Sequence, residues 1–253
     1  MRVLLLGATG TLGSRILSAL IKRGHTVSVF IRNPSKLAPG VQDEIFSIEC
    51  GDATKSSEIK EAALRTKCDA IVNSAGLASV SPWGRSSLPE IVDAVLSAAQ
   101  EIGRERGSPL RVWLLAGMGI LDIPTQKYML VDYIHVFPEH ILTWEKVQAV
   151  PREFVAWSVL GAGIMKPSSA ITYPVPEASS VENLLISARV PPEYSLRFLG
   201  VPLIGGYLNL LSQVLNYGPT TLEDNADLIA YDLLEGMDSP WIFQKVGVKE
   251  RKK

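Results

Sequence analysis

Three glycines near the N-terminus have the spacing of a phosphate-binding turn. Residues 3–6 are apolar and lead into Gly7, Gly10 and Gly13, and apolar residues then recur at helical spacing. A buried strand, a glycine turn and a helix form the arrangement that seats a dinucleotide pyrophosphate on the unpaired N–H groups of the helix. The spacing is G-x-x-G-x-x-G rather than G-x-G-x-x-G, so an ordinary strand-to-helix turn is the alternative interpretation.

Two cations follow the second expected strand, residues 26–31. Arg32 comes directly after it, and Lys36 lies four residues further on. A site that prefers NAD carries an acid here to hold the ribose 2′-hydroxyl. A guanidinium can instead pair bidentately with phosphate oxygens, so we expect NADP(H) as the cofactor. A solvated strand end would also carry such residues.

Composition and charge exclude several other functions. The chain has 253 residues, a formal net charge of −1 and 47% hydrophobic residues, which argues against electrostatic binding of nucleic acid. Two cysteines and three histidines provide neither a disulfide framework nor the spacing of a metal site. No signal peptide is recognisable before the first strand, so a cytoplasmic location is expected.

The order of patterns predicts a doubly wound parallel α/β sheet of the Rossmann type. Apolar strands are expected at residues 2–6, 26–31, 44–49, 70–74, 111–116 and 154–160. Helices are expected at 11–23, 56–65, 88–101, 138–150 and about 221–235, with a last edge strand at 241–246. Thr221 and Asp224 fit the start of the last helix.

Three regions follow from this order. Residues 1–166 form the expected dinucleotide-binding core, 167–220 a small substrate-binding insertion, and 221–253 a helix and edge strand that complete the core. Residues 198–215 are apolar enough to approach the length of a membrane span. Pro202, Gly205 and Gly206 interrupt them, however, so we expect a buried loop and helix, or a cover over an apolar ligand, and no integral membrane segment.

Four runs of sequence are similar to the atypical short-chain dehydrogenase/reductases. They are GATGTLG (7–13), GHTVSVFIRNPSK (24–36), GDAT (51–54) and VNSAG (72–76). The closest branch is NAD(P)H-binding and NmrA-like, and it includes the biliverdin-IXβ/flavin reductases. The resemblance covers roughly residues 1–165 and resumes weakly in 221–235.

This resemblance implies a set of cofactor contacts. Arg32 and Lys36 would hold the 2′-phosphate, and Ala116 and Gly117 would meet the cofactor at the end of the fifth strand. The pyrophosphate would be surrounded by Gly7, Thr9, Gly10, Thr11 and Leu12. The adenine would lie beside Asp52 and Ala53, and the ribose side would be lined by Ser74, Ala75 and Gly76. A turn at Asp52 and an ordinary strand end at 73–76 are the structural alternatives.

The proton-transfer residues of the classical family members are missing. Those enzymes end strand five with a serine and follow it with Tyr-x-x-x-Lys, whose lysine lowers the pKa of the tyrosine. Here Ala116 and Gly117 lie where the serine would be. Tyr128 is followed four residues on by Asp132, and Tyr133 by Phe137. A straightforward alcohol dehydrogenase is therefore not expected.

A histidine offers another proton donor. Glu139-His140-Ile141 matches an acid-His-Ile sequence of the reductase branch, and His140 would lie in the first helical turn near the nicotinamide. A surface or capping histidine is the alternative. The candidate catalytic residues are thus His140, Tyr133 and Tyr128, and Asp132 and His135 lie in the same loop.

The expected function is reduction of a hydrophobic carbonyl, enone or quinone-type molecule by NADP(H), with a polyketide or terpenoid of secondary metabolism among the candidate substrates. The presumed substrate region is aromatic, with Trp83, Trp144, Tyr173, Tyr194, Phe198, Tyr207 and Tyr217. Two alternatives stay open: a redox-neutral isomerase, cyclase or dehydratase, and a non-catalytic NADP(H)-sensing regulator. The sequence leaves the oligomeric state open.

Overall fold

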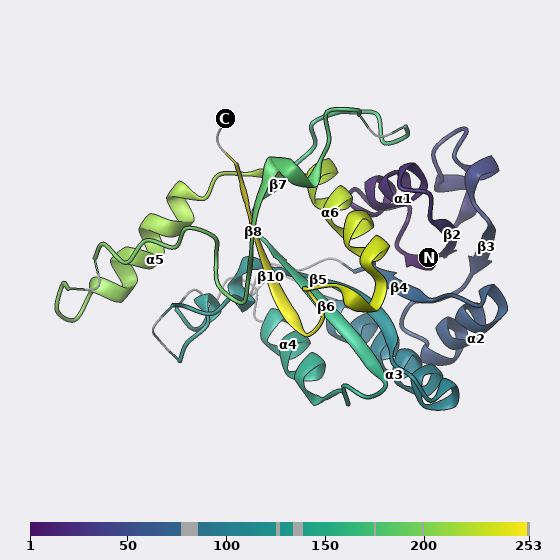
Figure 1. The fold of residues 1–253 in the computed structure, drawn as a ribbon, viewed down its shortest axis with the longest axis horizontal. Helices are drawn as coiled ribbons and strands as arrows, with labels where there is room; N and C mark the ends of the chain where they lie inside the picture. The colour runs from purple at the N-terminus through teal and green to yellow at the C-terminus, as the bar shows by residue number, and fades with distance from the viewer. Residues whose placement is uncertain (77–85, 125–126, 134–138, 175, 199, 252–253) are drawn as a thin grey trace.

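The protein is built around one twisted eight-stranded sheet in the order β3-β2-β1-β4-β5-β6-β10-β8 (Figure 1). The computed structural model describes residues 1–76, 86–124, 127–133, 139–174, 176–198 and 200–251. The sheet strands are β1 (Arg2–Leu6), β2 (Thr26–Ile31), β3 (Ser47–Cys50), β4 (Ala70–Asn73), β5 (Leu110–Gly117), β6 (Val155–Ala162), β8 (Leu184–Ala188) and β10 (Gln244–Glu250). A separate short pair joins β7 (Met165–Lys166) to β9 (Thr220–Thr221). The expected Rossmann-type fold is confirmed.

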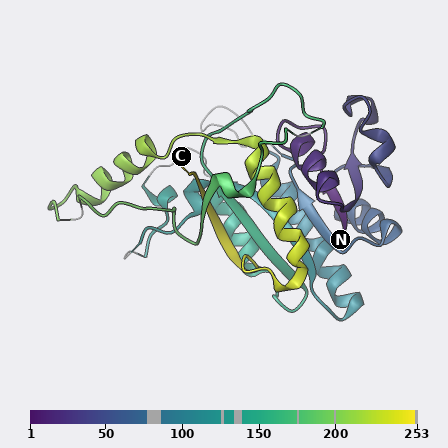
Figure 2. The ribbon, with the colours of Figure 1, turned by 45° about the horizontal axis from the view of Figure 1, so that its top comes forward.

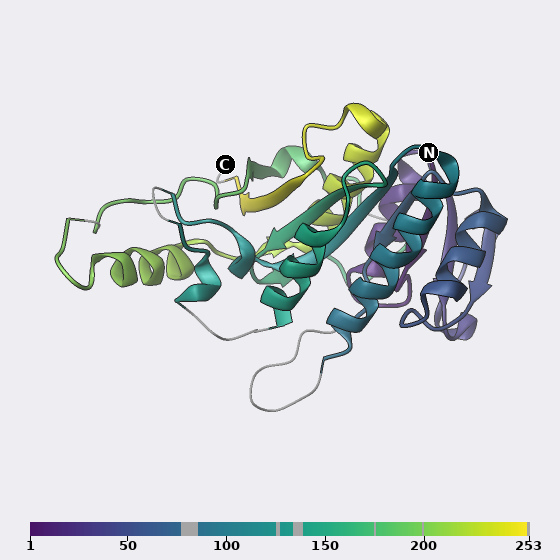
Figure 3. The ribbon, with the colours of Figure 1, turned by 90° about the horizontal axis from the view of Figure 1, so that it is seen from below.

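Helices cover both faces of the sheet, because β1 buries its side chains on both sides. Val3 and Leu5 pack toward α1 (Gly13–Lys22) and α6 (Leu222–Glu235), which lie side by side (Figure 2). Leu4 and Leu6 pack toward the opposite layer, seen from below in Figure 3, which consists of α2 (Ser56–Thr66), α3 (Leu88–Arg106) and α4 (Glu139–Ala149). Successive residues of a strand point to opposite faces, so a strand buried on both sides is continuously apolar.

The last strand was predicted at the wrong place in the sheet. It does not form an edge, because β10 lies between β6 and β8. It pairs parallel with β6 and antiparallel with β8. The edge strand β8 comes from within residues 167–220, where the sequence patterns predicted only an insertion. Prolines on both sides of residues 184–188 hid this short strand, and antiparallel pairing at an edge requires no crossover helix.

The buried loop and helix predicted over residues 198–215 are exposed at many of the described positions, and nothing tests the alternative of a cover over an apolar ligand. These residues lead into α5 (Gly205–Asn216), which projects from the sheet as part of an arm (Figures 1 and 3). Leu203 is fully exposed, and Ile204 and Tyr207 each expose 55% of their surface. The described residues contain no helix long and apolar enough to cross a membrane.

Helix α6 fastens the sheet to the segments around it through buried carboxylates. Thr221 accepts a hydrogen bond from the backbone N–H of Asp224 at 3.0 Å, which confirms the predicted helix start. Asp224 also accepts from the backbone of Ser180, and Asp227 accepts from Arg23 and from the backbone of Val181. These carboxylates hold both α1 and the chain before β8 against the helix.

A buried ion pair in the sheet belongs to the same helix. Asp232 of α6 accepts from the Arg111 guanidinium and from the Trp113 indole N–H, both at 2.7 Å, and also from the Ser239 hydroxyl. Arg111 additionally donates to the Ser158 hydroxyl at 2.8 Å. The Arg111 and Asp232 side chains are almost completely buried. Such a pair is tolerated in the interior because hydrogen bonds compensate for the lost hydration of its charges.

Removing one partner of this pair should destabilise the protein strongly. Asp232→Ala leaves the Arg111 charge buried without its carboxylate, and the expected loss in the free energy of unfolding is about 3–5 kcal/mol. Urea unfolding followed by circular dichroism measures it. Asp69→Ala is the matched control, because its pair with Arg2 is exposed and contributes roughly 0–1 kcal/mol. Similar losses in both variants would contradict a special contribution from the buried pair.

Candidate functional site

The glycine turn between β1 and α1 can only be built from glycines. Gly7 has a φ of +80°, and a Cβ there would lie 2.6 Å from the backbone nitrogen of Ala75. A Cβ on Gly13 would lie 2.0 Å from the carbonyl oxygen of Gly7. Side chains larger than hydrogen would therefore push the turn out of shape. The backbone lies open at its tip, where Gly10 and Thr11 are exposed.

The end of β4 locks onto this turn. The Ser74 hydroxyl donates to the carbonyl oxygen of Leu6 at 2.7 Å, and the backbone N–H of Ser74 donates to the same oxygen at 3.0 Å. The side chain of Ser74 is thus used to join β4 to β1, while Ala75 and Gly76 continue along the surface beside Gly7. The structure brings these three predicted residues together with the glycine turn at the carboxyl edge of the sheet, where open α/β sheets bind ligands.

Helix α1 begins with the properties of an anion site. Leu12 precedes it without a side-chain cap, and its first turn contains no acidic residue. The N–H groups of Ser14 and Arg15 already donate to the carbonyl oxygens of Gly10 and Leu12, so it is the positive end of the helix dipole that this end of α1 offers to a phosphate. A cavity of about 450 Å³ lies against this end of the helix. Its walls include Thr9, Gly10, Thr11, Ser14, Lys36, Thr172 and Tyr173. The turn and cavity fit a dinucleotide pyrophosphate.

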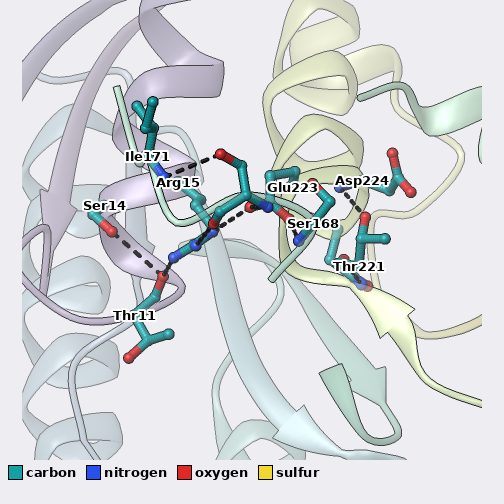
Figure 4. Close-up of polar contacts among 10 residues, drawn as sticks. Thr11, Ser14, Arg15, Ser168, Ile171, Thr221, Glu223 and Asp224 are labelled. Atoms are coloured by element: carbon teal, nitrogen blue, oxygen red, sulfur yellow. Dashed lines mark hydrogen bonds and ion pairs between the residues drawn. The ribbon is translucent and has the colours of Figure 1, made fainter. Parts of the chain in front are cut away.

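A buried arginine holds the turn from behind, and sequence reasoning missed it. Arg15 donates to the Glu223 carboxylate at 2.6 Å, to the carbonyl oxygen of Thr11 at 2.8 Å and to that of Ser169 at 2.6 Å (Figure 4). Glu223 also accepts from the backbone N–H of Ser168 at 2.8 Å. Burial raises the pKa of Glu223, but these hydrogen bonds outweigh burial and hold it below the ordinary value. The pair of charges joins the glycine turn, the chain after β7 and α6.

The predicted 2′-phosphate residues lie at the end of β2. Arg32 and Lys36 are both exposed, and Lys36 contributes to the wall of the cavity. Asp52 follows β3 and accepts from the backbone N–H of Thr54 at 3.0 Å, so the turn interpretation of Asp52 is realised. Hydrogen bonds from Thr54, and to a smaller extent the charges of Lys55 and Arg32, lower the pKa of Asp52. Ala53, next to Asp52, is half-buried.

His140 lies in the first turn of α4, as predicted, but it faces backbone rather than solvent. Its Nε2 accepts a hydrogen bond from the backbone N–H of Gly117 at 3.1 Å, and only 6% of the residue is exposed. Burial lowers its pKa, and the neighbouring Glu139 carboxylate raises it to a smaller extent. An imidazole nitrogen that accepts a hydrogen bond is unprotonated, so His140 is neutral here. It positions Gly117 and the half-buried Ala116 at the end of β5.

Tyr128 and Tyr133 lie together beside an apolar cluster. Their rings are 5.9 Å apart in an edge-to-face arrangement, and Tyr128 exposes 55% of its surface. Tyr133, Tyr194 and Met118 pack on the cluster, whose buried members are Leu121, Ile123, Leu130 and Leu210. Met118 directly follows Gly117, and its sulfur would lie 3.4 Å from a Cβ on Gly163 after β6. Tyr133 is therefore near the strand ends where the nicotinamide is expected.

The other aromatic residues of the predicted substrate region do not gather at one site. Trp144 packs edge-to-face on Trp157 within the sheet core, and Tyr173 lines the cavity by the glycine turn. Tyr217 is buried at the end of α5. Trp83 and His135 lie outside the described residues. Asp132 caps its own turn through the backbone N–H of Met129 at 2.8 Å.

Filling the glycine turn should weaken nucleotide binding strongly. Gly13→Ala places a methyl group against the Gly7 carbonyl oxygen, and the expected result is at least a roughly tenfold rise in the dissociation constant for NADPH, measured by calorimetry. Gly200→Ala is the matched control, because a Cβ there meets nothing within 4 Å. Unchanged affinity in a folded Gly13→Ala protein would argue against this turn as the phosphate site.

The neutral state of His140 predicts a pH dependence of stability. Because burial lowers its pKa, the unfolded chain binds a proton that the folded chain excludes, so stability should fall as the pH drops below about 6.5. Burial lowers the pKa of His25 as well, and it should add to the same slope. His140→Gln should flatten the profile of unfolding free energy between pH 8 and pH 5, and His25→Gln serves as the comparison. A His140→Gln profile identical to that of the native protein would refute this assignment.

Comparisons with known proteins agree with this geometry. Residues 3–103 match the model of the NAD-dependent epimerase/dehydratase family. The fold of the whole chain is similar to that of ChuY, an anaerobillin reductase from Escherichia coli O157:H7, with 16% identity, a TM-score of 0.62, and coverage of 100% of this chain and 98% of ChuY. No curated protein sequence matches the chain.

Two further solved structures share the fold. The oxidoreductase ylbE from Lactococcus lactis is 14% identical with a TM-score of 0.63, over 100% of this chain and 92% of that chain. A Streptococcus pneumoniae protein proposed to be an NADH-flavin reductase is 17% identical with a TM-score of 0.58, over 99% and 100%. The glycine turn and the parallel sheet agree with the match of residues 3–103 to the NAD-dependent epimerase/dehydratase family.

Proposed function

We propose that this chain is an NADP(H)-dependent oxidoreductase that reduces a hydrophobic carbonyl, enone or quinone-type small molecule. One observation carries the proposal: two exposed cations, Arg32 and Lys36, follow β2, and Lys36 lines the cavity at the glycine turn. In this fold the end of the second strand faces the adenosine ribose, where a 2′-phosphate distinguishes NADP from NAD. A guanidinium and an ammonium there favour the additional phosphate.

The residues at the carboxyl edge have separate tasks in this proposal. Gly7, Gly10, Thr9, Thr11 and Leu12 hold the pyrophosphate, and Ser74, Ala75 and Gly76 border the ribose. Bound NADPH supplies a hydride. Ala116 and Gly117 form a wall without side chains that would obstruct the nicotinamide, and His140 keeps this wall in place through its hydrogen bond to the Gly117 N–H.

Tyr133 is the best supported proton donor among the three candidates. It is half-buried beside Met118 and Tyr194, whereas the Nε2 of His140 already accepts a hydrogen bond and Tyr128 is mostly exposed. A phenol next to the reduced carbonyl can deliver a proton to the developing alkoxide or enolate. Tyr128 packs on the ring of Tyr133 and would orient it.

An apolar, flat acceptor suits the surroundings of Tyr133. The cluster beneath it consists of Leu121, Ile123, Leu130 and Leu210. An apolar wall with few polar groups selects hydrophobic ligands. ChuY is named for reducing anaerobillin and the pneumococcal protein for reducing flavin, which supports acceptors of this kind.

Free thiols at Cys50 and Cys68 are consistent with a cytoplasmic location.

A redox-neutral reaction on the same scaffold is the second candidate. The observation that favours it is the sequence at β5, where Ala116 and Gly117 replace the serine of the classical enzymes and no Tyr-x-x-x-Lys follows. An isomerase, cyclase or dehydratase would convert its substrate without consuming NADPH. Substrate conversion at constant absorbance of NADPH distinguishes it from the reductase.

Reversing the charge at the end of β2 tests the proposal. In Arg32→Glu, the KM for NADPH should rise by about tenfold or more while the KM for NADH changes little, because only NADPH carries the 2′-phosphate. Oxidation of both cofactors is followed by absorbance with a panel of quinones, flavins and enones. Lys22→Glu, an exposed cation at the far end of α1, is the control. Equal losses for both cofactors would contradict the phosphate assignment, and bound NADPH without turnover on any acceptor would contradict the reductase.

A further inference from the structure

The arm around α5 has no charged side chain over a long stretch. Residues 198–222 contain no Asp, Glu, Lys or Arg, although one residue in five of the whole chain is charged. The stretch is nevertheless exposed at many positions, because the arm projects from the sheet (Figures 1 and 2). A segment without charged residues would ordinarily lie in the core, so the exposure of this segment needs an explanation.

The polar face of α5 points inward. Asn209, whose surface is 0% exposed, accepts a hydrogen bond from the backbone N–H of Phe198 at 2.7 Å. One helical turn later, Gln213 accepts from the backbone N–H of Ser195 at 3.2 Å. These two buried amides tie the helix to the preceding chain. Leu210 anchors α5 in the apolar cluster with Leu121 and Leu130.

The opposite face of α5 is apolar and faces outward. Ile204, Tyr207 and Leu211 lie at spacings of three and four residues, and they expose 55%, 55% and 42% of their surfaces. At 3.6 residues per turn these positions share a stripe about 100° wide or less. Leu203 and Val201, in the turn before the helix, extend the stripe. The apolar side chains of this helix therefore face outward and its polar amides face inward, the reverse of a helix that packs on a protein core.

Cations flank the stripe at both ends. Arg197 precedes the turn and is exposed, and its guanidinium lies over the Phe198 ring at 5.6 Å. At the base of the arm, the Lys249 ammonium lies 5.8 Å from the centre of the Tyr217 ring and pairs with Glu193 at 2.6 Å. Arg251 follows on the exposed end of β10.

We propose that this arm docks on the surface of an anionic lipid bilayer. An interfacial helix presents an apolar face to the acyl boundary and places an aromatic ring and cations at the headgroups, as Tyr207, Arg197 and Arg251 can do. The helix lies parallel to the membrane plane, so no spanning segment is needed. The exposed cations beside the stripe, Arg197 and Arg251, favour an anionic surface. A second copy of this chain is the other occupant, and the test below distinguishes it. The proposal does not depend on the reductase function.

Vesicle sedimentation tests this docking. The full chain is mixed with vesicles of phosphatidylcholine alone, or of phosphatidylcholine with roughly 30% phosphatidylserine. The chain is expected to sediment with the anionic vesicles, and more weakly with the neutral ones. Ile204→Asp combined with Leu211→Asp should lower the partition coefficient by about tenfold or more, because both apolar contacts are replaced by charges that anionic lipid repels.

Leu64→Asp is the matched control, because Leu64 of α2 is also 43% exposed and lies away from the arm. It should sediment like the native chain, and circular dichroism checks that each variant is folded. Native chain that stays in the supernatant with both vesicle types overturns the proposal. So does a native dimer in analytical ultracentrifugation that becomes monomeric in the double variant and binds no vesicles, since the stripe would then bind a second copy.

Discussion

The buried ion pair between Arg15 and Glu223 fixes the position of the glycine turn that we propose holds the cofactor. Arg15 lies on α1 directly behind the glycine turn and holds it through the carbonyl oxygen of Thr11, while Glu223 belongs to the first turn of α6, 208 residues further along the chain. Two charges are costly in an apolar interior unless hydrogen bonds replace their hydration. Here Ser168 and Ser169 supply those bonds, so the chain after β7 must lie where it does for the pair to form. The glycine turn that we propose holds the phosphates is consequently held in place by the C-terminal helix.

The other acidic residues of α6 repeat this principle along one helix. Asp224, Asp227 and Asp232 are each almost fully buried, and each binds a different segment: the chain before β8, the end of α1, and the centre of the sheet at Arg111. Apolar packing between α1 and α6 would leave the two helices free to slide, because it is not directional. Carboxylates with fixed partners remove that freedom. The geometry of the glycine turn thus follows from where α6 docks, and the C-terminal region is part of the unit that we propose binds the cofactor.

Local rules explain why much of the core could be predicted. β1, the glycine turn and the Thr221 cap depend on neighbouring residues, so their patterns can be read directly from the sequence. The misplaced elements depend on distant partners. β10 reads as a final strand, and only the antiparallel pairing of β8 shows that it is not an edge. The partners of the Arg15–Glu223 pair are far apart in the sequence, so no local spacing indicates it. In α5 the polar residues Asn209 and Gln213 are buried by hydrogen bonds to the preceding chain, while the apolar Leu203 before the helix is exposed, which is the reverse of what hydrophobicity predicts.

The end of β5 connects the remaining parts of the site. There is no serine at this strand end, and the backbone N–H of Gly117 donates a hydrogen bond to the imidazole of His140. A histidine used in this way must stay neutral, so it supports the wall of the site rather than titrating in it. In the proposed reductase the proton would come from another group, and Tyr133, the proposed donor, packs on the same apolar cluster as Leu210 of α5. The same helix therefore carries an outward apolar stripe and an inward anchor beside the proposed proton donor. A surface that binds the outer face of α5 would therefore also restrain Leu210 and the apolar cluster next to Tyr133. The proposed docking of the arm is linked in this way to the packing of the proposed site.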